Sequence, residues 1–305
     1  MTNILITGDL FLQNQNHLNQ LEEANLNPIF IKSNSADEET LINTINENKI
    51  EGYIIGGVEQ VTDRVLKEAN TLKSIVFTGT DYRPYVPGIQ TAKDKNISIG
   101  NVVGTYVDSV AEIGLAQMIS VSRRAALLQR NATESFITTK SLIESHVGLL
   151  GGGLTSIRLV EMLTGIGVKK ISYANRSVSP RMEKLGCQKL PVEELCKEVD
   201  VLTILIAYEA GEVLTKEFID NIPTGSGIVN LSKPSAFDQQ ALAKRVNKRE
   251  LFGYSDYTPT EGSLLDSDPT VFQYNCESNA FNTFSSVDAC SVEAIKKLVT
   301  LLKNY

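Results

Sequence analysis

The amino-acid sequence predicts an α/β protein in which doubly wound parallel sheets form two domains. Three observations support this prediction. Short apolar runs alternate with helix-like segments over most of the 305 residues. Several of these runs end in glycine, as strands that lead into a tight turn commonly do. Residues 147–176 read as a strand, a glycine turn, a helix and a second strand.

Residues 1–101 contain five apolar runs separated by helix-like segments, which predicts a parallel sheet with crossover helices. The runs read NILITG, PIFIK, GYIIGG, SIVFTG and NISIGN. Gly8, Gly56, Gly79 and Gly100 close four of them at the carboxyl ends of the expected strands, where open α/β sheets bind ligands. Each glycine is therefore either a plain turn or part of a binding site.

The glycines of residues 147–176 match the first positions of the dinucleotide fingerprint. Gly151 lets the chain turn, Gly153 lets a pyrophosphate approach the backbone, and Ser156 is the small residue where helix meets strand. Free N–H groups at a helix start bind phosphate oxygens. The predicted phosphate site therefore includes the first residues of the helix, which are Leu154, Thr155 and Ser156.

The remaining elements follow from the same periodicities. Residues 106–130 form a long amphipathic segment, which predicts one helix between the two α/β units. Further strands are expected at 201–206, 227–231, 251–255 and 271–274, and helices near 191–197, 215–221, 238–248 and 292–303. The last helix is expected to return to the first unit.

Composition excludes several classes of function. The net charge of −7 and the isoelectric point near 5.1 argue against binding to nucleic acid or to an anionic membrane. The four cysteines have no CxxC spacing and there are only two histidines, so no metal site is expected. The first residues lack the features of a signal peptide and no apolar run spans a membrane, so we expect a cytoplasmic protein with reduced thiols.

Four blocks of the sequence resemble a known family. They are NVVGTYVDSVAEIGLAQMISVSRR at 101–124, VGLLGGG at 147–153, NLSKPSAFDQQAL at 230–242 and SDYTPTEG at 255–262. In this order and spacing, nearly the whole chain resembles the D-isomer-specific 2-hydroxyacid dehydrogenases. The resemblance implies two Rossmann-like doubly wound parallel-sheet domains with an interdomain cleft for NAD(P)H and substrate. It implies a flavodoxin-like substrate domain of residues 1–101 plus 281–305, a dinucleotide-binding domain of residues 102–280, and a homodimer.

An arginine, a glutamate and a histidine carry the chemistry in that family, and this sequence keeps part of the set. Glu261 matches the glutamate. Lys233 stands at the arginine position, where it attracts a carboxylate as a point charge without a bidentate fork. Cys276 stands at the histidine position, and neither His17 nor His146 is placed to replace it. The usual glutamate–histidine pair is therefore absent.

Each of these three positions also has a plainer interpretation. Glu261 could be a solvated loop residue, Lys233 a surface charge and Cys276 a small core residue. Tyr106 and Tyr274 are then rival proton donors. The resemblance also implies a loop of backbone amides around the substrate carboxylate, formed by Thr78, Gly79 and Thr80, with Tyr106 as a further substrate contact.

The expected cofactor is NADPH, with NADH less favoured. NAD-preferring sites usually end their second strand with an acidic residue, which repels a 2′-phosphate. This sequence has Asn175 there, followed by Arg176 and Ser177, which can bind phosphate oxygens. The resemblance adds Ser232 and Asp256 as cofactor contacts, with Asp256 at the nicotinamide end.

The sequence therefore predicts an NAD(P)H-dependent reductase on a 2-hydroxyacid dehydrogenase scaffold. Because the positioned histidine is missing, we expect an atypical small or peptidic substrate with a keto group, an imine or an activated double bond. Two alternatives remain open: a catalytically silent nucleotide-binding sensor or scaffold, and an ordinary 2-keto acid reductase with a relocated proton donor.

Overall fold

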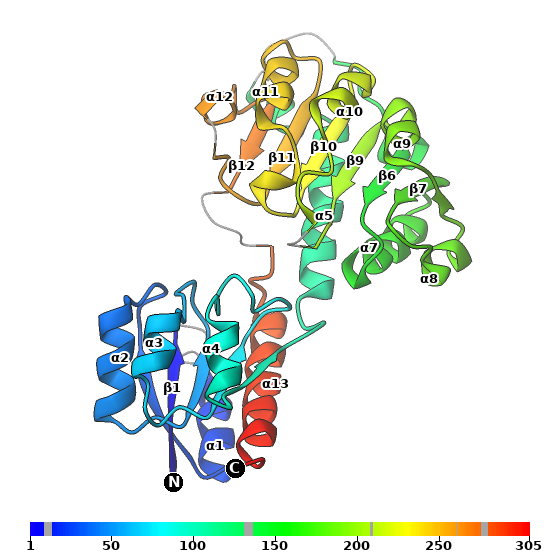
Figure 1. Cartoon of the computed structure of the whole chain (residues 1–305). Helices are drawn as coiled ribbons and strands as arrows, with labels where there is room; N and C mark the ends of the chain where they lie inside the picture. Colours follow the sequence, from blue (N-terminus) through cyan, green and yellow to red (C-terminus); the bar gives the residue numbers. More distant parts are fainter. Residues whose placement is uncertain (9–13, 131–136, 208–209, 261, 276–279) are drawn as a thin grey trace. The chain divides into compact units, whose positions relative to one another are not determined.

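A computed structural model describes residues 1–8, 14–130, 137–207, 210–260, 262–275 and 280–305. The chain divides into two compact units (Figure 1). Unit 1 comprises Met1–Tyr106 and Thr283–Tyr305, and unit 2 comprises Val107–Asn282. Each unit is an α/β structure built on a parallel sheet, so the predicted fold class is confirmed.

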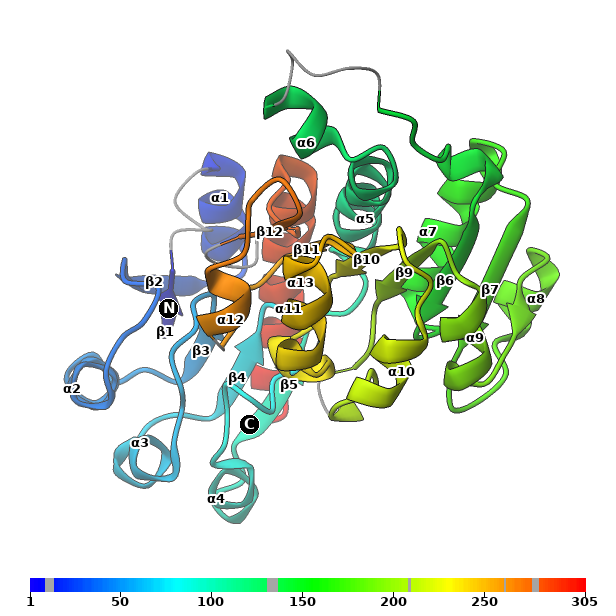
Figure 2. The same ribbon diagram turned by 90° about the horizontal axis from the view of Figure 1, so that it is seen from above.

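Unit 1 contains a parallel sheet with the strand order β2-β1-β3-β4-β5. The strands are β1 (Thr2–Thr7), β2 (Leu26–Ile31), β3 (Gly52–Ile55), β4 (Ser74–Phe77) and β5 (Ser98–Asn101), and the helices are α1 (Gln15–Glu23), α2 (Glu38–Glu47), α3 (Asp63–Glu68), α4 (Ile89–Asp94) and α13 (Phe284–Leu302). Figure 2 shows α1 and α13 on one face of the sheet and α2, α3 and α4 on the other.

The strands of unit 1 are apolar on both sides because helices cover both faces of the sheet. On β3, Ile54 packs into the core beneath α1 and α13, whereas Tyr53 and Ile55 pack into the core beneath α2, α3 and α4. Helix α13 begins at Phe284, earlier than the predicted 292–303, because Thr283 caps it by accepting from the Ser286 N–H.

Unit 2 contains a parallel sheet with the strand order β12-β11-β10-β9-β6-β7-β8. The strands are β6 (His146–Leu150), β7 (Lys170–Ala174), β8 (Gln188–Lys189), β9 (Val201–Ile204), β10 (Gly227–Asn230), β11 (Phe252–Ser255) and β12 (Phe272–Tyr274). The helices are α5 (Val107–Ser122), α6 (Ala125–Arg130), α7 (Leu154–Gly165), α8 (Pro180–Lys184), α9 (Val192–Glu198), α10 (Lys216–Asn221), α11 (Gln239–Asn247) and α12 (Gly262–Leu265). The short elements β8, α8 and α12 were not expected from the sequence.

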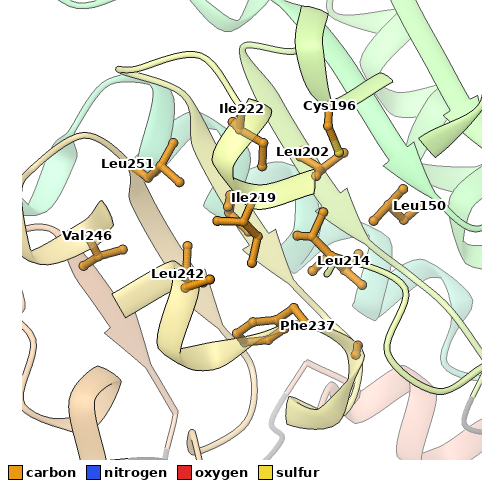
Figure 3. Packing of buried hydrophobic residues seen from close by; sticks show 14 of the residues in the cluster. Leu150, Cys196, Leu202, Leu214, Ile219, Ile222, Phe237, Leu242, Val246 and Leu251 are labelled. Atoms are coloured by element: carbon orange, nitrogen blue, oxygen red, sulfur yellow. The ribbon is translucent and has the colours of Figure 1, made fainter. Parts of the chain in front are cut away.

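The core on one face of this sheet joins α10 and α11 to β9. Figure 3 shows Leu202 of β9, Ile219 of α10 and Leu242 of α11 gathered around a common centre. All three side chains are buried.

Among the described residues, no helix is both long and apolar enough to cross a membrane.

The prediction of one helix over residues 106–130 is wrong. Helix α5 ends at Ser122 and α6 begins at Ala125. Between them, Arg124 adopts a positive φ of 49°, which an α-helix does not allow. Its guanidinium carbon lies 4.3 Å from the centroid of the Phe252 ring, so a cation–π contact stabilises the break.

Candidate functional site

The glycine loop after β6 brings the backbone to a helix start. Gly151 has a φ of +112°, and a Cβ atom on it would lie 2.1 Å from the Leu205 carbonyl oxygen, so only glycine fits there. A Cβ atom on Gly153 would meet no atom within 4 Å. Gly153 therefore leaves an open approach to the backbone.

Helix α7 begins at this open position without a side-chain cap. The first backbone hydrogen bond of the helix runs from the Ile157 N–H to Gly153 O over 3.0 Å. The N–H groups of Leu154, Thr155 and Ser156 have no acceptor in the part of the chain that the structure describes. The side chain of Ser156 is buried. These residues fit a pyrophosphate bound through backbone N–H groups.

The loop after β7 lies beside the glycine loop. Asn175 donates to Ser177 O over 3.1 Å, and a Cβ atom on Gly152 would lie 3.0 Å from Asn175 Nδ2. Arg176 and Ser177 are exposed. Among the described residues, no carboxylate forms an ion pair with Arg176. Arg176 thus directly follows Asn175, the residue that lies beside the glycine loop.

Ser232 joins the carboxyl ends of β9 and β10. It is buried, and its hydroxyl oxygen accepts from the Ile206 N–H over 2.9 Å. The hydroxyl lies 3.2 Å from Ile204 O and can donate to it. Lys233 follows directly, is partly exposed, and caps the short 3-10 helix Pro234–Ala236. Both residues therefore lie at the edge of the sheet where α/β proteins bind ligands.

Asp256 directly follows β11 and is buried, with 1% of its surface exposed. Its Oδ1 accepts from the Tyr254 hydroxyl over 3.1 Å and from Asn275 Nδ2 over 2.8 Å. Its Oδ2 accepts from the Ala280 N–H over 3.3 Å. Burial, followed by the nearby Asp256 carboxylate, raises the pKa of Tyr254. Asp256 thus ties the segments after β11 and β12 together.

Gln239 was not identified from the sequence as a site residue. It is buried at the start of α11. Its Oε1 accepts from the Thr260 N–H over 2.8 Å, and its Nε2 donates to Thr260 Oγ1 over 2.8 Å and to Pro234 O over 3.3 Å. Gln239 therefore joins the residues that follow Lys233 to the residue that precedes Glu261. Glu261 and Cys276 themselves lie outside the described residues.

The predicted substrate loop of unit 1 follows β4. Thr78 is buried and its hydroxyl donates to Ile55 O over 2.9 Å, so that proton is already used within the protein. The carbonyl oxygens of the loop also accept bonds: Thr78 O from Cys290 Sγ, Gly79 O from Val102 N and Thr80 O from Asn101 Nδ2. In the described part of the chain, the N–H groups of Gly79 and Thr80 have no acceptor. The loop therefore offers donors rather than acceptors.

Tyr106 lies beneath this loop. Its hydroxyl is close to Cys290 and Thr78, and burial is the main cause that raises its pKa. A phenol with a raised pKa keeps its proton at neutral pH and stays a donor.

Each histidine has a partner within its own unit. His146 opens β6 at the end opposite to Gly151, where Nε2 lies 2.9 Å from Ser172 Oγ and Nδ1 donates to Glu198 O. Burial lowers the pKa of His146. His17 is buried on α1, with Nε2 2.8 Å from Asp288. Among the described residues, no cluster of three or more histidine, cysteine or acidic side chains could hold a metal.

The chain is similar in sequence to a set of dehydrogenases. The family model described as "D-isomer specific 2-hydroxyacid dehydrogenase, NAD binding domain" matches residues 115–275. A hydroxypyruvate reductase of Thermotoga maritima is 23% identical over 71% of this chain and 71% of its own length. The D-3-phosphoglycerate dehydrogenase of Homo sapiens is 21% identical over 90% of this chain but 52% of its own length, so the chain spans about half of that relative.

Solved structures share the fold over almost the whole chain. A protein from Thermus thermophilus aligns with a TM-score of 0.83 at 18% identity, covering 99% of this chain and 97% of that one. The NAD+-bound 3-phosphoglycerate dehydrogenase of Entamoeba histolytica aligns at 0.81, with 19% identity and coverage of 100% and 96%. An acyclic imino acid reductase in complex with NADPH and D-Arg aligns at 0.81, with 17% identity and coverage of 100% and 98%.

Proposed function

The chain belongs to the D-isomer-specific 2-hydroxyacid dehydrogenase family, and on that premise we propose that it reduces a small 2-imino acid with NADPH. The predicted recognition of the family is confirmed, and with it the class of nicotinamide-dependent oxidoreductases. The observation that supports the substrate class is the loop of Thr78, Gly79 and Thr80 in unit 1, here called the donor loop. Its carbonyl oxygens accept hydrogen bonds within the protein, whereas the N–H groups of Gly79 and Thr80 have no acceptor among the described residues.

A nicotinamide cofactor fits the loops of unit 2. The open backbone at Gly153 and the uncapped start of α7 match a pyrophosphate. Arg176 is exposed and follows Asn175 beside that loop, where it would bind a 2′-phosphate, and Asn175 brings no negative charge to repel it. These features support NADPH over NADH. When bound, the reduced nicotinamide supplies a hydride.

The substrate class follows from the donor loop. Two consecutive backbone N–H groups that have no acceptor within the described protein can donate to the oxygens of a carboxylate. A small 2-oxo or 2-imino acid carries such a carboxylate. In unit 2, the positive charge of Lys233 also favours an anionic substrate.

The missing histidine favours the imine. Hydride addition to a ketone forms an alkoxide, which must take a proton, and a positioned acid accelerates that step by roughly 10²–10⁴-fold. A protonated imine already carries its proton, and hydride addition gives a neutral amine directly. The replacement of the histidine by Cys276 then lowers the rate of reduction only slightly. One protein of this fold is an imino acid reductase bound to NADPH and D-Arg.

A 2-keto acid reductase with a relocated donor is the second candidate, and Tyr106 favours it. Its hydroxyl lies beside Thr78 of the predicted substrate loop, so this phenol could deliver the proton that the histidine delivers elsewhere in the family. A silent nucleotide-binding protein is the third candidate.

One assay separates these candidates. NADPH consumption is followed by the absorbance of the reduced ring with pyruvate alone and with pyruvate plus methylamine, which form an imine in solution. Imine reduction predicts consumption that depends on methylamine. Equal consumption without the amine would support the keto acid reductase, and NADPH binding without consumption across a panel of 2-oxo acids and amines would support the silent protein.

We also infer that the protein forms a homodimer, as the family resemblance implies. Ile119 on α5 and Leu128 on α6 are exposed, with 43% and 38% of their surfaces accessible, and they provide apolar area for pairing. Light scattering that finds only the 33.4 kDa species at micromolar concentration would reject this inference.

A further inference from the structure

Cys290 of α13 touches the donor loop from inside unit 1. Its Sγ donates to the Thr78 carbonyl oxygen over 2.7 Å, and 1% of the residue is exposed. We propose that Cys290 is a positioning residue: by holding the Thr78 carbonyl, it aims the Gly79 N–H at the substrate carboxylate. This inference rests on the proposed function, because it assigns a task to the same anion site.

The geometry of the peptide bond links the two ends of this contact. In a trans peptide, the C=O of one residue and the N–H of the next lie in one plane and point in opposite directions. The described peptides are all trans. When the Thr78 carbonyl points toward Cys290, the Gly79 N–H must therefore point away from α13.

The next two peptides are held in the same way. The Gly79 carbonyl accepts from the Val102 N–H over 3.2 Å, which turns the Thr80 N–H outward. The Thr80 carbonyl accepts from Asn101 Nδ2, which turns the Asp81 N–H outward. Three successive carbonyls are thus bound within unit 1, and the N–H group that follows each carbonyl points away from the donor of that carbonyl.

Glycine makes this restraint necessary. Gly79 has no side chain, and a Cβ atom there would lie 2.4 Å from the Phe77 ring, so a larger residue does not fit. Glycine also gives the Thr78–Gly79 peptide more rotational freedom than any other residue would. The Thr78 N–H and hydroxyl both bind Ile55 O and fix the residue before that peptide. The Cys290 thiol fixes the peptide itself.

The test uses the full chain labelled with 15N and pyruvate as the probe. Pyruvate is titrated while the amide signals of Gly79 and Thr80 are followed, and the dissociation constant is taken from their shifts. In the unmutated protein both signals shift. In Cys290→Ala the Thr78 carbonyl loses its donor, and we expect pyruvate affinity to fall about three- to tenfold. Cys290→Ser restores a donor and should return the affinity to within about twofold.

Three controls separate positioning from general damage. Ser291→Ala removes a neighbouring buried hydroxyl that donates to Val287 O of its own helix, and Cys196→Ala removes a buried thiol of unit 2. Neither should change pyruvate affinity. NADPH affinity should stay within about twofold in every variant. Cys290→Val also lacks a donor but fills the space of the sulfur, so it replaces Cys290→Ala if the smaller residue prevents folding.

The outcomes distinguish the two claims. If pyruvate shifts Gly79 and Thr80 in the unmutated protein and binds the folded alanine or valine variant with equal affinity, the positioning role is wrong while the anion site stands. If pyruvate leaves both signals unchanged in the unmutated protein, the anion site itself is wrong and this inference falls with it. Weakening by alanine or valine together with rescue by serine supports the positioning role.

Discussion

A Cβ atom on Gly151 would lie 2.1 Å from the carbonyl oxygen of Leu205, whereas a Cβ atom on Gly153 would meet no atom within 4 Å. The fold therefore requires a glycine at position 151, whereas position 153 has room for a side chain. If a pyrophosphate passes over Gly153, the two positions should respond differently to the same substitution.

We predict that Gly151→Ala lowers both the melting temperature and NADPH affinity, because its positive φ and the Leu205 contact exclude a side chain. Gly153→Ala should leave the melting temperature within about 2 °C, since a ΔΔG below ~0.5 kcal/mol is typical of open surface positions. It should still weaken NADPH binding about tenfold or more. Thermal unfolding and fluorescence titration measure the two effects, and unchanged NADPH binding in Gly153→Ala would place the pyrophosphate elsewhere.

Arg176→Ala should narrow the preference for NADPH over NADH by roughly tenfold or more, because a hydrogen bond to a charged group contributes about 1.5–3 kcal/mol. NADH affinity should hardly change. Arg181→Ala is the matched control: Arg181 is exposed on nearby α8 and its guanidinium lies 3.6 Å from Glu161. Calorimetric titration of both cofactors gives the ratio, and equal affinities in the unmutated protein would refute the NADPH proposal.

Much of the fold could be predicted from local pattern alone. Buried parallel strands are apolar on both faces, so runs such as residues 52–55 are visible without tertiary information. The break at Arg124 was not visible, because its positive φ accompanies a contact with Phe252, more than a hundred residues away. A periodic apolar pattern continues across such a break and reads as one helix.

The same limit applies to the candidate site. Gly151 carries a local signature, and its positive φ agrees with the turn that the fingerprint requires. Cys290 carries none, because its partner Thr78 follows β4, 212 residues earlier in the chain. Gln239 has only its place at the start of a helix. Residues that hold loops through long-range hydrogen bonds become identifiable only when the partners are known.

The three described cysteines should resist alkylation in the native protein. Burial raises the pKa of Cys187 to about 11, of Cys196 to about 12 and of Cys290 to about 11. A higher thiol pKa means less reactive thiolate, so about one part in a thousand or less is ionised at pH 8. Iodoacetamide followed by peptide mass spectrometry should label them only after denaturation. Rapid native labelling of any of the three would contradict their burial.

The same raised pKa values make stability fall at alkaline pH. The folded protein holds these thiol protons above the pH at which the unfolded chain, with thiol pKa values of about 8.5, loses them. Stability is therefore complete below about pH 8.5 and declines as pH rises toward 11. In urea titrations, the free energy of unfolding of Cys196→Ala should fall less steeply with pH over that range than that of the unmutated protein. An unchanged dependence on pH would contradict the raised pKa of Cys196.

Cys276→Ser should leave turnover within about tenfold, because an imine brings its own proton and the thiol is not needed as an acid. Cys276→His should leave NADPH affinity within about twofold. Steady-state kinetics with saturating NADPH measure the first effect. A fall of roughly 10³-fold in Cys276→Ser at unchanged cofactor affinity would identify the thiol as the general acid.

The most direct test of the imine proposal follows the transferred hydrogen. The protein is incubated with pyruvate, methylamine and NADPH that carries deuterium at both positions of the reduced ring carbon, and the products are analysed by mass spectrometry. We predict N-methylalanine with one deuterium on its α-carbon. When methylamine is omitted, the amount of labelled lactate should be at least a hundredfold lower than that amount of N-methylalanine. Labelled lactate formed as fast without the amine, or N-methylalanine without deuterium, would contradict hydride transfer to the imine.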